Sequence, residues 1–255
     1  MIPLVVVGAA GRMGRAVEQA AAAAAGFTLK ARVDPAGTGA GYARDAAPHV
    51  EAGDVVVEFS SPAGCRAAAG LCAARGAALV SGTTGLSAQD EAAVRDAAGK
   101  VAVLRAANFS LGVLALRRAL QAALAAVPAD WDLEIVERHH RGKADSPSGT
   151  ALALAAEAAR ARGLTEQAVR CGRERGRTGP RLPGEIAVHA LRGGTWVGDH
   201  EVLLAGEGEW LELRHVAQDR AAFAHGVLAA ARFVAGASPG LYTLDDAVND
   251  RGREP

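Results

Sequence analysis

The chain has 255 residues, 50% of them apolar, and its 28 Lys and Arg residues balance its 28 Asp and Glu residues. This length and composition are typical of a globular protein with one large or two modest domains. Balanced charge argues against broad attraction to nucleic acid or an anionic membrane, and no apolar stretch is long enough to span a bilayer. We therefore expect neither as a partner.

The start of the chain and its cysteines indicate a cytoplasmic protein. Met1-Ile2-Pro3 leads directly into a predicted strand, without a basic region or a signal-type apolar core, so we expect the mature chain to begin here and to stay in the cytoplasm. Cys65 and Cys72 lie about 10 Å apart on one predicted helix, which is too far for a disulfide. Because Cys171 is isolated, we expect three reduced thiols.

The N-terminal part begins with a strand, a glycine turn and a helix. The strand covers Pro3 to Val7, the turn is GAAGRMG at residues 8–14, and the Ala-rich helix runs to Ala25. A second strand, Thr28 to Val33, ends at Asp34, where dinucleotide-binding folds place a ribose-binding acid. The glycine spacing is G-x-x-G-x-x-G instead of G-x-G-x-x-G, so the motif gains its meaning from this context.

Three further units repeat the strand-and-helix pattern. Their strands are Asp54 to Phe59, Ala77 to Val80 and Val101 to Leu104, and the loops that follow contain Ser60-Ser61-Pro62, Ser81-Gly82-Thr83-Thr84-Gly85 and Asn108-Phe109-Ser110. Apolar strands separated by helices predict a Rossmann-like, doubly wound parallel sheet, in which ligands bind beyond the carboxyl ends of the strands. An ordinary turn explains any one of these loops, but four on one edge indicate a nucleotide crevice.

The acid after the second strand indicates the cofactor. The Asp34 carboxylate accepts a hydrogen bond from a ribose 2′-hydroxyl and repels a 2′-phosphate, and Pro35 supplies no basic group. Arg12 in the glycine turn is a candidate for reaching such a phosphate. We therefore expect NADH as the preferred cofactor, with NADPH also accepted.

The pattern changes after the fifth strand. A helix at Leu111 to Val127 precedes a strand at Trp131 to His139, and three strand-like runs separated by glycine-rich turns follow later, at Glu185 to Leu191, Trp196 to Leu204 and Trp210 to Val216. Consecutive strands of this kind predict a second, α+β domain with a mixed or antiparallel sheet. The Arg-rich stretch from Arg170 to Arg181 contains glycines and a proline, and we interpret it as a solvated loop.

The last predicted helix defines the domain boundaries. Asp219 to Val234 has a helical pattern, and we expect it to pack on the nucleotide domain. Residues 1–110 and 218–255 then form the dinucleotide-binding domain, and residues 111–217 form the second domain.

The residues from Glu137 to Thr150 predict an anion pocket with a proton source. Ser148 is a candidate N-cap for a helix over Ala151 to Ala159, whose first amides then point toward Lys143 and favour a carboxylate or phosphate. Histidine is the side chain whose charge most readily changes near neutral pH, so we expect either of the adjacent His139 and His140 to be able to gain or lose a proton. A negatively charged substrate that needs a proton finds both requirements met here.

Two other interpretations of this segment are open. Adjacent histidines suggest a metal, but neighbours on a strand point to opposite faces and no further ligand has a usual spacing, so we expect none. Charged residues of a surface loop are also often merely solvated. Against this interpretation, the helix start that follows would offer free amides for binding an anion. We interpret the scattered residues His189, His200, His215 and His225 as structural.

These motifs resemble the dihydrodipicolinate reductase family nearly end to end. The matching segments are GAAGRMG at 8–14, GTTG at 82–85, NFSLGV at 108–113, ERHHRGKADSPSGTAL at 137–152, EIAVHALRGGTWVGDH at 185–200 and PGLYTLDDAV near the C-terminus. The HH-x-x-K-x-D-x-PSGT block is highly specific. Leu114, Ala187 and Asp199 depart from the family's usual Asn, Gly and Glu.

The resemblance implies an NAD(P)H-dependent oxidoreductase that reduces 4-hydroxy-tetrahydrodipicolinate to tetrahydrodipicolinate with loss of water, in the biosynthesis of diaminopimelate and lysine. It implies that His139 is the proton donor, that Lys143 assists and holds a substrate carboxylate, and that His140, Ser148, Gly149 and Thr150 bind substrate. The cofactor-binding residues that it implies are Gly8, Ala9, Ala10, Gly11, Arg12, Met13, Gly14, Asp34, Phe59, Gly82, Thr83, Thr84, Ala106, Ala107, Asn108 and Phe109. It also implies a homotetramer assembled through the second domain's sheet.

Two alternatives remain at this point. One is another two-domain NAD(P)-dependent reductase that acts on an imine or semialdehyde, and the other is a dinucleotide sensor without catalytic activity. Both share the predicted cofactor edge, but the combination of His139, Lys143 and the Gly149-Thr150 amides argues against them.

Overall fold

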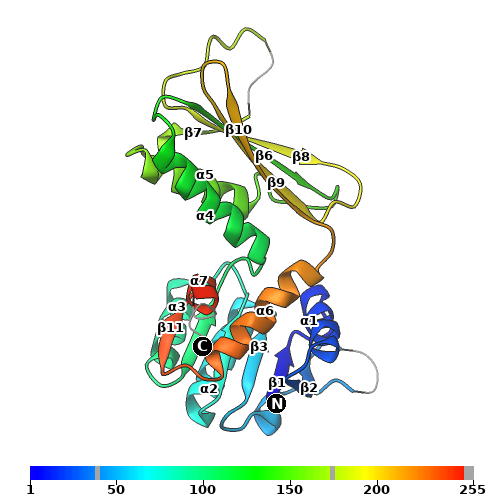
Figure 1. Ribbon diagram of the computed structural model, residues 1–255. Helices are drawn as coiled ribbons and strands as arrows, with labels where there is room; N and C mark the ends of the chain where they lie inside the picture. Colours follow the sequence, from blue (N-terminus) through cyan, green and yellow to red (C-terminus); the bar gives the residue numbers. More distant parts are fainter. Residues whose placement is uncertain (38–40, 173–175, 250–255) are drawn as a thin grey trace. The chain divides into compact units, whose positions relative to one another are not determined.

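A computed structural model describes residues 1–37, 41–172 and 176–249 and shows two units, each with its own sheet (Figure 1). The first unit contains Met1–Leu111 and the C-terminal segment from Arg220, and the second contains Gly112–Asp219. The α/β class predicted from the sequence is confirmed.

Six parallel strands form the sheet of the first unit, in the order β11-β5-β4-β3-β1-β2. Their bounds are β1 Ile2–Val7, β2 Phe27–Val33, β3 Val55–Glu58, β4 Ala78–Ser81, β5 Ala102–Arg105 and β11 Gly240–Tyr242. The five predicted strands are present. The edge strand β11 was not expected, because three residues are too few to show a hydrophobic period.

Helices cover both faces of this sheet (Figure 1). Their bounds are α1 Arg12–Ala23, α2 Pro62–Arg75, α3 Ala88–Ala98, α6 Ala221–Val234 and α7 Leu244–Asn249. Helices α1 and α6 pack together on one face, and α2 and α3 pack together on the other. Helix α6 packs on β3, β4 and β5, so the last long helix lies in the first unit.

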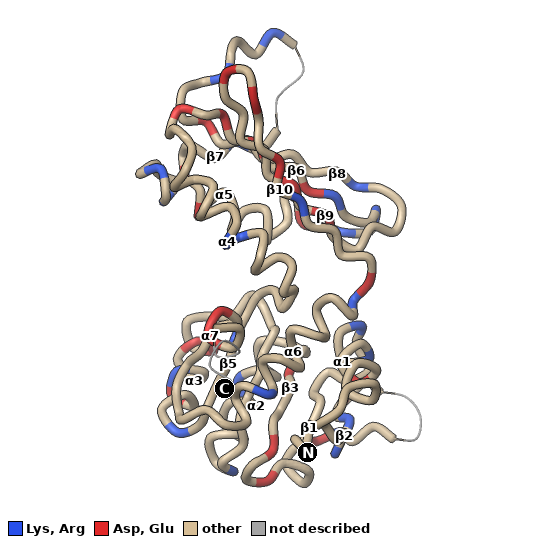
Figure 2. The backbone as a smooth tube through the Cα atoms, viewed as in Figure 1, with Lys and Arg blue, Asp and Glu red and all other residues tan. Residues whose placement is uncertain are grey.

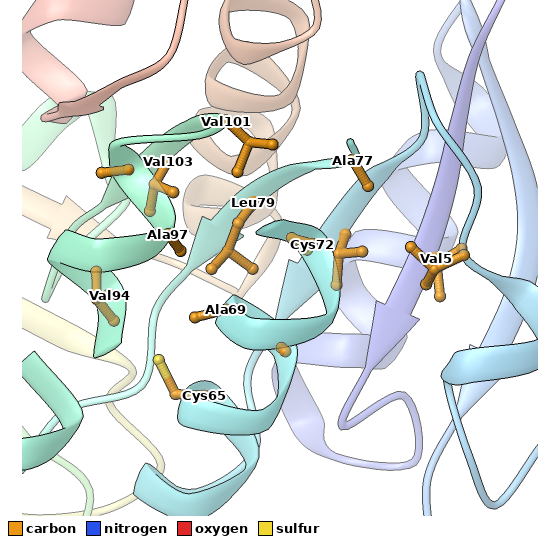
Figure 3. Packing of buried hydrophobic residues seen from close by; sticks show 14 of the residues in the cluster. Val5, Cys65, Ala69, Cys72, Ala77, Leu79, Val94, Ala97, Val101 and Val103 are labelled. Carbon is orange, nitrogen blue, oxygen red and sulfur yellow. The ribbon is translucent and has the colours of Figure 1, made fainter. Parts of the chain in front are cut away.

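The space between α2, α3 and the sheet is filled with small apolar side chains (Figure 3). Cys65 and Cys72 lie in this cluster, fully buried, and both are free thiols, as is the exposed Cys171. Burial raises the pKa of Cys65 to about 11 and that of Cys72 to about 12. The expectation of three reduced thiols is confirmed, and the two buried ones are packing residues.

Five strands form the mixed sheet of the second unit, in the order β10-β9-β6-β8-β7. The elements of this unit are α4 Leu111–Ala126, β6 Asp132–His139, α5 Gly149–Ala161, β7 Val169–Cys171, β8 Ile186–Arg192, β9 Gly198–Ala205 and β10 Trp210–Ala217. The β6–β8 and β8–β7 pairs are parallel, whereas β9 runs antiparallel to both β6 and β10. The predicted mixed sheet is therefore confirmed.

Alternation along β6 separates the two faces of this sheet. Leu133 and Ile135 are buried in one core with Leu120 of α4 and Leu154 of α5, so both helices cover this face. The opposite face carries ion pairs such as that between Arg138 and Asp199, and red and blue segments lie near one another on β6, β9 and β10 in Figure 2.

The prediction of a solvated loop from Arg170 to Arg181 is wrong at both ends. Val169–Cys171 is strand β7, which pairs with β8. The Arg181 side chain is 14% exposed, donates to the carbonyls of Leu133, at 2.8 Å, and Glu185, and pairs with Asp132 and Glu134. The sequence does not show the partners on Asp132, Leu133 and Glu134, because these residues lie on β6, distant along the chain. Residues 173–175 lie outside the described residues.

None of the helices in the described segments combines the length and the apolarity that crossing a bilayer requires.

Candidate active site and dinucleotide pocket

A cavity of about 630 Å³ lies at the carboxyl ends of β1, β2 and β3 in the first unit. Of the predicted cofactor residues, Gly8, Gly11, Asp34 and Phe59 line it. The other lining residues include Pro35, Arg44, Ser60, Ser61 and Gly64. This is the edge of a parallel sheet at which ligands bind, so the cavity occurs where the sequence places the nucleotide crevice.

The glycine turn lets the backbones of three elements approach closely. Gly8 has φ +80°, and a Cβ there would lie 2.2 Å from the Phe59 carbonyl oxygen. A Cβ on Gly14 would lie 2.4 Å from the Gly8 carbonyl oxygen. Arg12, Met13 and Gly14 are the first residues of α1, and the N-cap Gly11 lines the cavity. An open glycine turn that leads into a helix N-terminus fits a dinucleotide pyrophosphate.

Asp34 follows β2 and holds the turn through both carboxylate oxygens. Oδ2 accepts from the Ala10 amide at 3.0 Å, and Oδ1 accepts from the Ala36 amide at 2.9 Å. A carboxylate oxygen accepts more than one hydrogen bond, so this carboxylate is still able to receive a ribose hydroxyl. Arg44 lines the same cavity, which sequence reasoning did not foresee because Arg44 has no motif context.

Glu58 is completely buried and joins the loops after β3 and β4. Its Oε1 accepts from the Ser60 amide at 2.7 Å and from the Thr83 hydroxyl at 2.8 Å, and its Oε2 accepts from the Ser81 hydroxyl at 2.7 Å. A Cβ on Gly82 would lie 2.0 Å from the Phe59 ring. The carboxyl group and the glycine thus set the spacing between these two loops.

The remaining predicted cofactor residues lie on the same sheet edge but do not line the cavity. Ala9 is buried in the turn, and Thr84 follows β4. Ala106, Ala107 and Asn108 follow β5, and the Asn108 Oδ1 accepts from the Ser110 amide at 2.8 Å. The Phe109 ring packs edge-on against Phe59, with centroids 5.6 Å apart.

In the second unit, three strands bring a polar cluster to the helix-covered face of the sheet. Glu137 and His139 alternate in phase with the core residues of β6. His139 pairs in register with Arg192 of β8, and Glu137 pairs with His200 of β9. Sequence reasoning placed His139 in the site, interpreted His200 as structural and assigned no role to Glu137 or Arg192.

Glu137 is fully buried and has its oxygens held by three groups. Arg192 donates to Oε2 at 2.7 Å and to Oε1 at 2.8 Å, and the Ser148 amide donates to Oε1 at 2.9 Å. His139 Nδ1 lies 2.6 Å from Oε2. Burial raises the pKa of Glu137, but the hydrogen bonds from Arg192, His139 and Ser148 outweigh it and hold this pKa below its ordinary value. The group is therefore a carboxylate.

His139 and His200 form an edge-on pair of buried rings, with centroids 5.2 Å apart. Burial lowers the pKa of His139, and the Glu137 carboxylate opposes this in part. Burial lowers the pKa of His200 to about 4, so this ring is neutral at pH 7. Its Nε2 lies 3.0 Å from the Ser148 hydroxyl, while its Nδ1 has no hydrogen-bond partner among the described residues.

The start of α5 confirms the predicted helix cap. The Ser148 Oγ accepts from the Ala151 amide at 3.2 Å, and Gly149 and Thr150 are the first two helical residues. Their amides belong to the helix turn that favours anions. Ser148 has a second role, because its own amide binds Glu137 and so ties the helix cap to the His139 cluster.

The Lys143 ammonium group is paired with a nearby carboxylate, that of Asp145. Its Nζ contacts both Asp145 oxygens at 2.8 Å, and the Asp145 side chain is 62% exposed. The hydrogen bond from Lys143 holds the pKa of Asp145 below its ordinary value. The Lys143 amide donates to the His140 carbonyl at 3.0 Å, which closes the turn after β6. Lys143 therefore binds the carboxylate of Asp145 in this structure.

Among the described residues, no group of three His, Cys, Asp or Glu side chains has a geometry suited to a metal ion.

Comparison with known proteins identifies both units. Family models match residues 2–109 as dihydrodipicolinate reductase, N-terminus, and residues 112–248 as dihydrodipicolinate reductase, C-terminus. A 4-hydroxy-tetrahydrodipicolinate reductase from Thermomicrobium roseum is 46% identical over 97% of this chain and 100% of its own length. One from Sinorhizobium fredii is 45% identical over 95% of this chain and 96% of its own length.

Solved structures share the fold. A dipicolinate-bound dihydrodipicolinate reductase from Paenisporosarcina sp. TG-14 superposes with a TM-score of 0.77 at 23% identity, covering 95% of this chain and 97% of that chain. A C. glutamicum DAP dehydrogenase in complex with DAP gives a TM-score of 0.55 at 14% identity, covering 100% and 99%. These likenesses concern the fold alone.

Proposed function

The chain belongs to the dihydrodipicolinate reductase family, and from this premise we propose how its residues reduce 4-hydroxy-tetrahydrodipicolinate to tetrahydrodipicolinate. It is an oxidoreductase of diaminopimelate and lysine biosynthesis, and its first unit is a dinucleotide-binding domain. The net reaction adds one hydride and one proton to the ring and releases water. The bound reduced nicotinamide supplies the hydride.

One observation carries the assignment of roles: the carboxylate that holds the buried His139 also binds the N-cap of α5, and Lys143 lies in the turn that follows His139. Hydride addition to an unsaturated ring leaves negative charge, which an adjacent acid neutralises. His139 is this acid. Lys143 holds one substrate carboxylate in place of Asp145, and the Gly149 and Thr150 amides hold the other. His140, half-buried in the turn that the Lys143 amide closes, also binds the substrate.

The 630 Å³ cavity supports the cofactor assignment. The glycine turn, residues 8–14, binds the pyrophosphate, and Asp34 accepts from the adenosine ribose. NADH is the preferred cofactor because the carboxylate of Asp34 disfavours a 2′-phosphate. NADPH is accepted because Arg44 lines the same cavity and offers a positive charge. The loops that carry Thr83 and Phe109 position the nicotinamide end.

The quaternary and cellular assignments follow the family resemblance. The chain acts as a homotetramer assembled through the sheet of the second unit, whose uncovered face carries the Arg138, Asp199 and Arg214 ion pairs. It acts in the cytoplasm on a small dianionic substrate, without nucleic acid or membrane partners. Sedimentation of the purified chain tests the tetramer.

A coupled assay tests the activity. The pathway synthase makes the unstable substrate in place from pyruvate and aspartate semialdehyde, and the absorbance of NADH or NADPH is followed. We expect cofactor oxidation that depends on both the synthase and this protein. Oxidation that is absent with both cofactors would overturn the proposed activity.

A further inference from the structure

We propose that Glu137 is a positioning residue: its carboxylate, held in turn by Arg192 and the Ser148 amide, keeps a proton on His139 Nδ1, so that all proton exchange with substrate occurs at Nε2. This inference rests on the proposed role of His139 as the proton donor and deepens it. It assigns a function to three groups that the substrate itself does not need to touch.

The tautomer follows from the hydrogen bonds of Glu137. A carboxylate only accepts hydrogen bonds, and Oε2 lies 2.6 Å from His139 Nδ1. Nδ1 therefore carries a proton in the neutral and the charged ring alike. A hydrogen bond at one imidazole nitrogen fixes the state of the other, so Nε2 is the nitrogen that gains and loses the exchangeable proton.

The sheet leaves space at this nitrogen. A Cβ on Gly198 of β9 would lie 3.3 Å from His139 Nε2, and glycine has none. The His139 side chain is 11% exposed, against 0% for Glu137. The Nδ1 side of the ring is thus enclosed by its carboxylate, while the Nε2 side faces the strand position that lacks a side chain.

Arg192 makes it easier for His139, paired with Glu137, to release its proton. An isolated buried carboxylate attracts the imidazole proton strongly, but two hydrogen bonds from Arg192 neutralise the charge of Glu137. The charged or titratable groups that face His139 are Glu137, Lys143, Arg192 and His200, and of these only Glu137 favours the protonated ring. Burial, Lys143 and Arg192 lower the pKa of His139, so the protonated ring gives up its proton readily.

The substitution Glu137→Gln removes the carboxylate that fixes the proton on His139 Nδ1, while the size and shape of the side chain at position 137 are kept. A glutamine oxygen at the Oε1 position satisfies both the Arg192 and the Ser148 donors, which leaves the NH₂ group facing Arg192 and His139 Nδ1. The neutral ring must then accept at Nδ1 and carry its proton on Nε2, and the charged ring has no acceptor. We expect kcat to fall about 10²–10³-fold with KM for substrate changed less than about threefold.

The tautomer itself is measured without reference to activity. Nitrogen-15 spectra of the imidazoles, with the His139 signals assigned by their loss in His139→Gln, report which nitrogen is protonated. We expect the Nδ1–H form in the unaltered protein and the Nε2–H form in Glu137→Gln. Circular dichroism and thermal unfolding identify the variants that fold. An Nε2–H ring in the folded, unaltered protein would overturn the proposal.

A second Glu–His pair on the same strand provides the matched control. Glu134 binds His189 Nε2 at 2.5 Å and also pairs with an arginine, Arg181, on the opposite face of the sheet. Glu134→Gln should therefore leave kcat, KM and the pH profile unchanged. If Glu134→Gln lost as much kcat as Glu137→Gln, both losses would be due to general damage of the sheet. The proposed positioning of His139 by Glu137 would then be refuted.

Arg192 tests the charge balance in the opposite direction. In Arg192→Met, Glu137 keeps His139 and loses its counterion, so the pH at which kcat/KM declines on the alkaline side should rise. In Glu137→Gln this pH should fall, and in Arg192→Lys, which keeps the charge, it should stay near its original value. A fall in Arg192→Met would contradict the proposal.

The role of His139 as proton donor and the role of Glu137 as positioning residue can be refuted separately. Unchanged turnover in His139→Gln removes the proton donor of the proposed function, whatever Glu137 does. A large loss in His139→Gln together with full activity in folded Glu137→Gln retains the proposed function and rejects the positioning role.

Discussion

Among the described residues, each unit contains one completely buried glutamate near the end of a central strand, and the two differ in their partners. Glu58 of β3 accepts from neutral hydroxyl and amide groups, on Ser60, Ser81 and Thr83. Glu137 of β6 accepts from the cationic Arg192, from His139 and from one amide. The first arrangement joins two loops, whereas the second holds an imidazole whose pKa burial lowers and the Glu137 carboxylate in part restores.

This difference shows what a buried carboxyl group can be used for. Surrounded by hydroxyls, it fixes the geometry of the backbone that approaches a ligand. Surrounded by a cation and an imidazole, it determines where a proton resides. Perturbing the first unit should therefore alter cofactor binding, and perturbing the second should alter turnover.

The largest effect is expected at His139. His139→Gln removes the acid but keeps much of the side-chain volume, so kcat should fall about 10²–10⁴-fold while KM changes only a few-fold. Steady-state kinetics with synthase-generated substrate measures both. An effect confined to KM would place His139 among the binding groups and weaken the contrast between the units.

Lys143→Ala should affect both binding and turnover. The variant loses a cation that contacts a carboxylate at 2.8 Å, and we expect kcat/KM for substrate to fall about 100-fold, with KM raised and kcat lowered. Asp145→Asn is the matched control: it removes the competing carboxylate and should lower KM. Equal kinetics for Lys143→Ala and the unaltered protein would exclude Lys143 from the substrate site.

In the first unit, Asp34 and Arg44 should control the choice of cofactor. Asp34→Asn removes the charge that repels a 2′-phosphate and should raise the NADPH-to-NADH ratio of kcat/KM about tenfold. Arg44→Ala should lower this ratio by a similar factor. Competition between the two cofactors at fixed substrate gives the ratio. Shifts of this ratio in opposite directions would support the roles of Asp34 and Arg44 in cofactor choice. An unchanged ratio in both variants would contradict them.

Glu58→Gln is the counterpart of Glu137→Gln. The hydroxyls of Ser81 and Thr83 can rotate to accept from the new amide, so we expect a loss of about 1–3 kcal/mol in the free energy of unfolding and a several-fold rise in cofactor KM. Because no reacting proton is involved, kcat should remain within about twofold. Denaturant titration and saturation kinetics measure these quantities, and a large fall in kcat would erase the distinction between the two glutamates.

The smallest effect concerns acid stability in the second unit. The folded pKa of His200, about 4, lies below the ordinary value of 6.5, so the unfolded chain binds a proton that the folded chain rejects. Stability from this group is complete above pH 6.5 and is lost as the pH falls toward 4. His200→Phe should reduce the slope of unfolding free energy against pH in this range, and an unchanged slope would point to other groups.

Much of this architecture was predictable from local pattern. The β1 strand, the glycine turn and α1 follow from an apolar run, closely spaced glycines and an Ala-rich segment, and the Ser148 cap follows from its position before an apolar helix. Strand β7 and strand β11 were not predictable, because each has three residues and depends on a distant partner strand.

The candidate site divides in the same way. His139, Lys143 and the start of α5 are neighbours in the chain, so one short motif revealed them. Arg192 and His200 reach Glu137 through the register of β8 and β9 on β6, and only the folded chain shows that Arg44 lines the same cavity as Asp34. Lys143 and Asp145 are only two residues apart, so their proximity was evident from the sequence. The sequence does not reveal which way their side chains point.

By itself, the sequence determined most of the strands and helices, the glycine turn and the residues that we propose carry the chemistry, because these depend on periodicity and on contacts between chain neighbours. The tertiary structure alone decided which charge each of these residues meets. A hydrogen bond between strands depends on sheet register, and burial depends on what covers a face. The hydrogen bonds from Arg192 to Glu137, and the burial of Glu137 beside His139, are therefore properties of the folded chain.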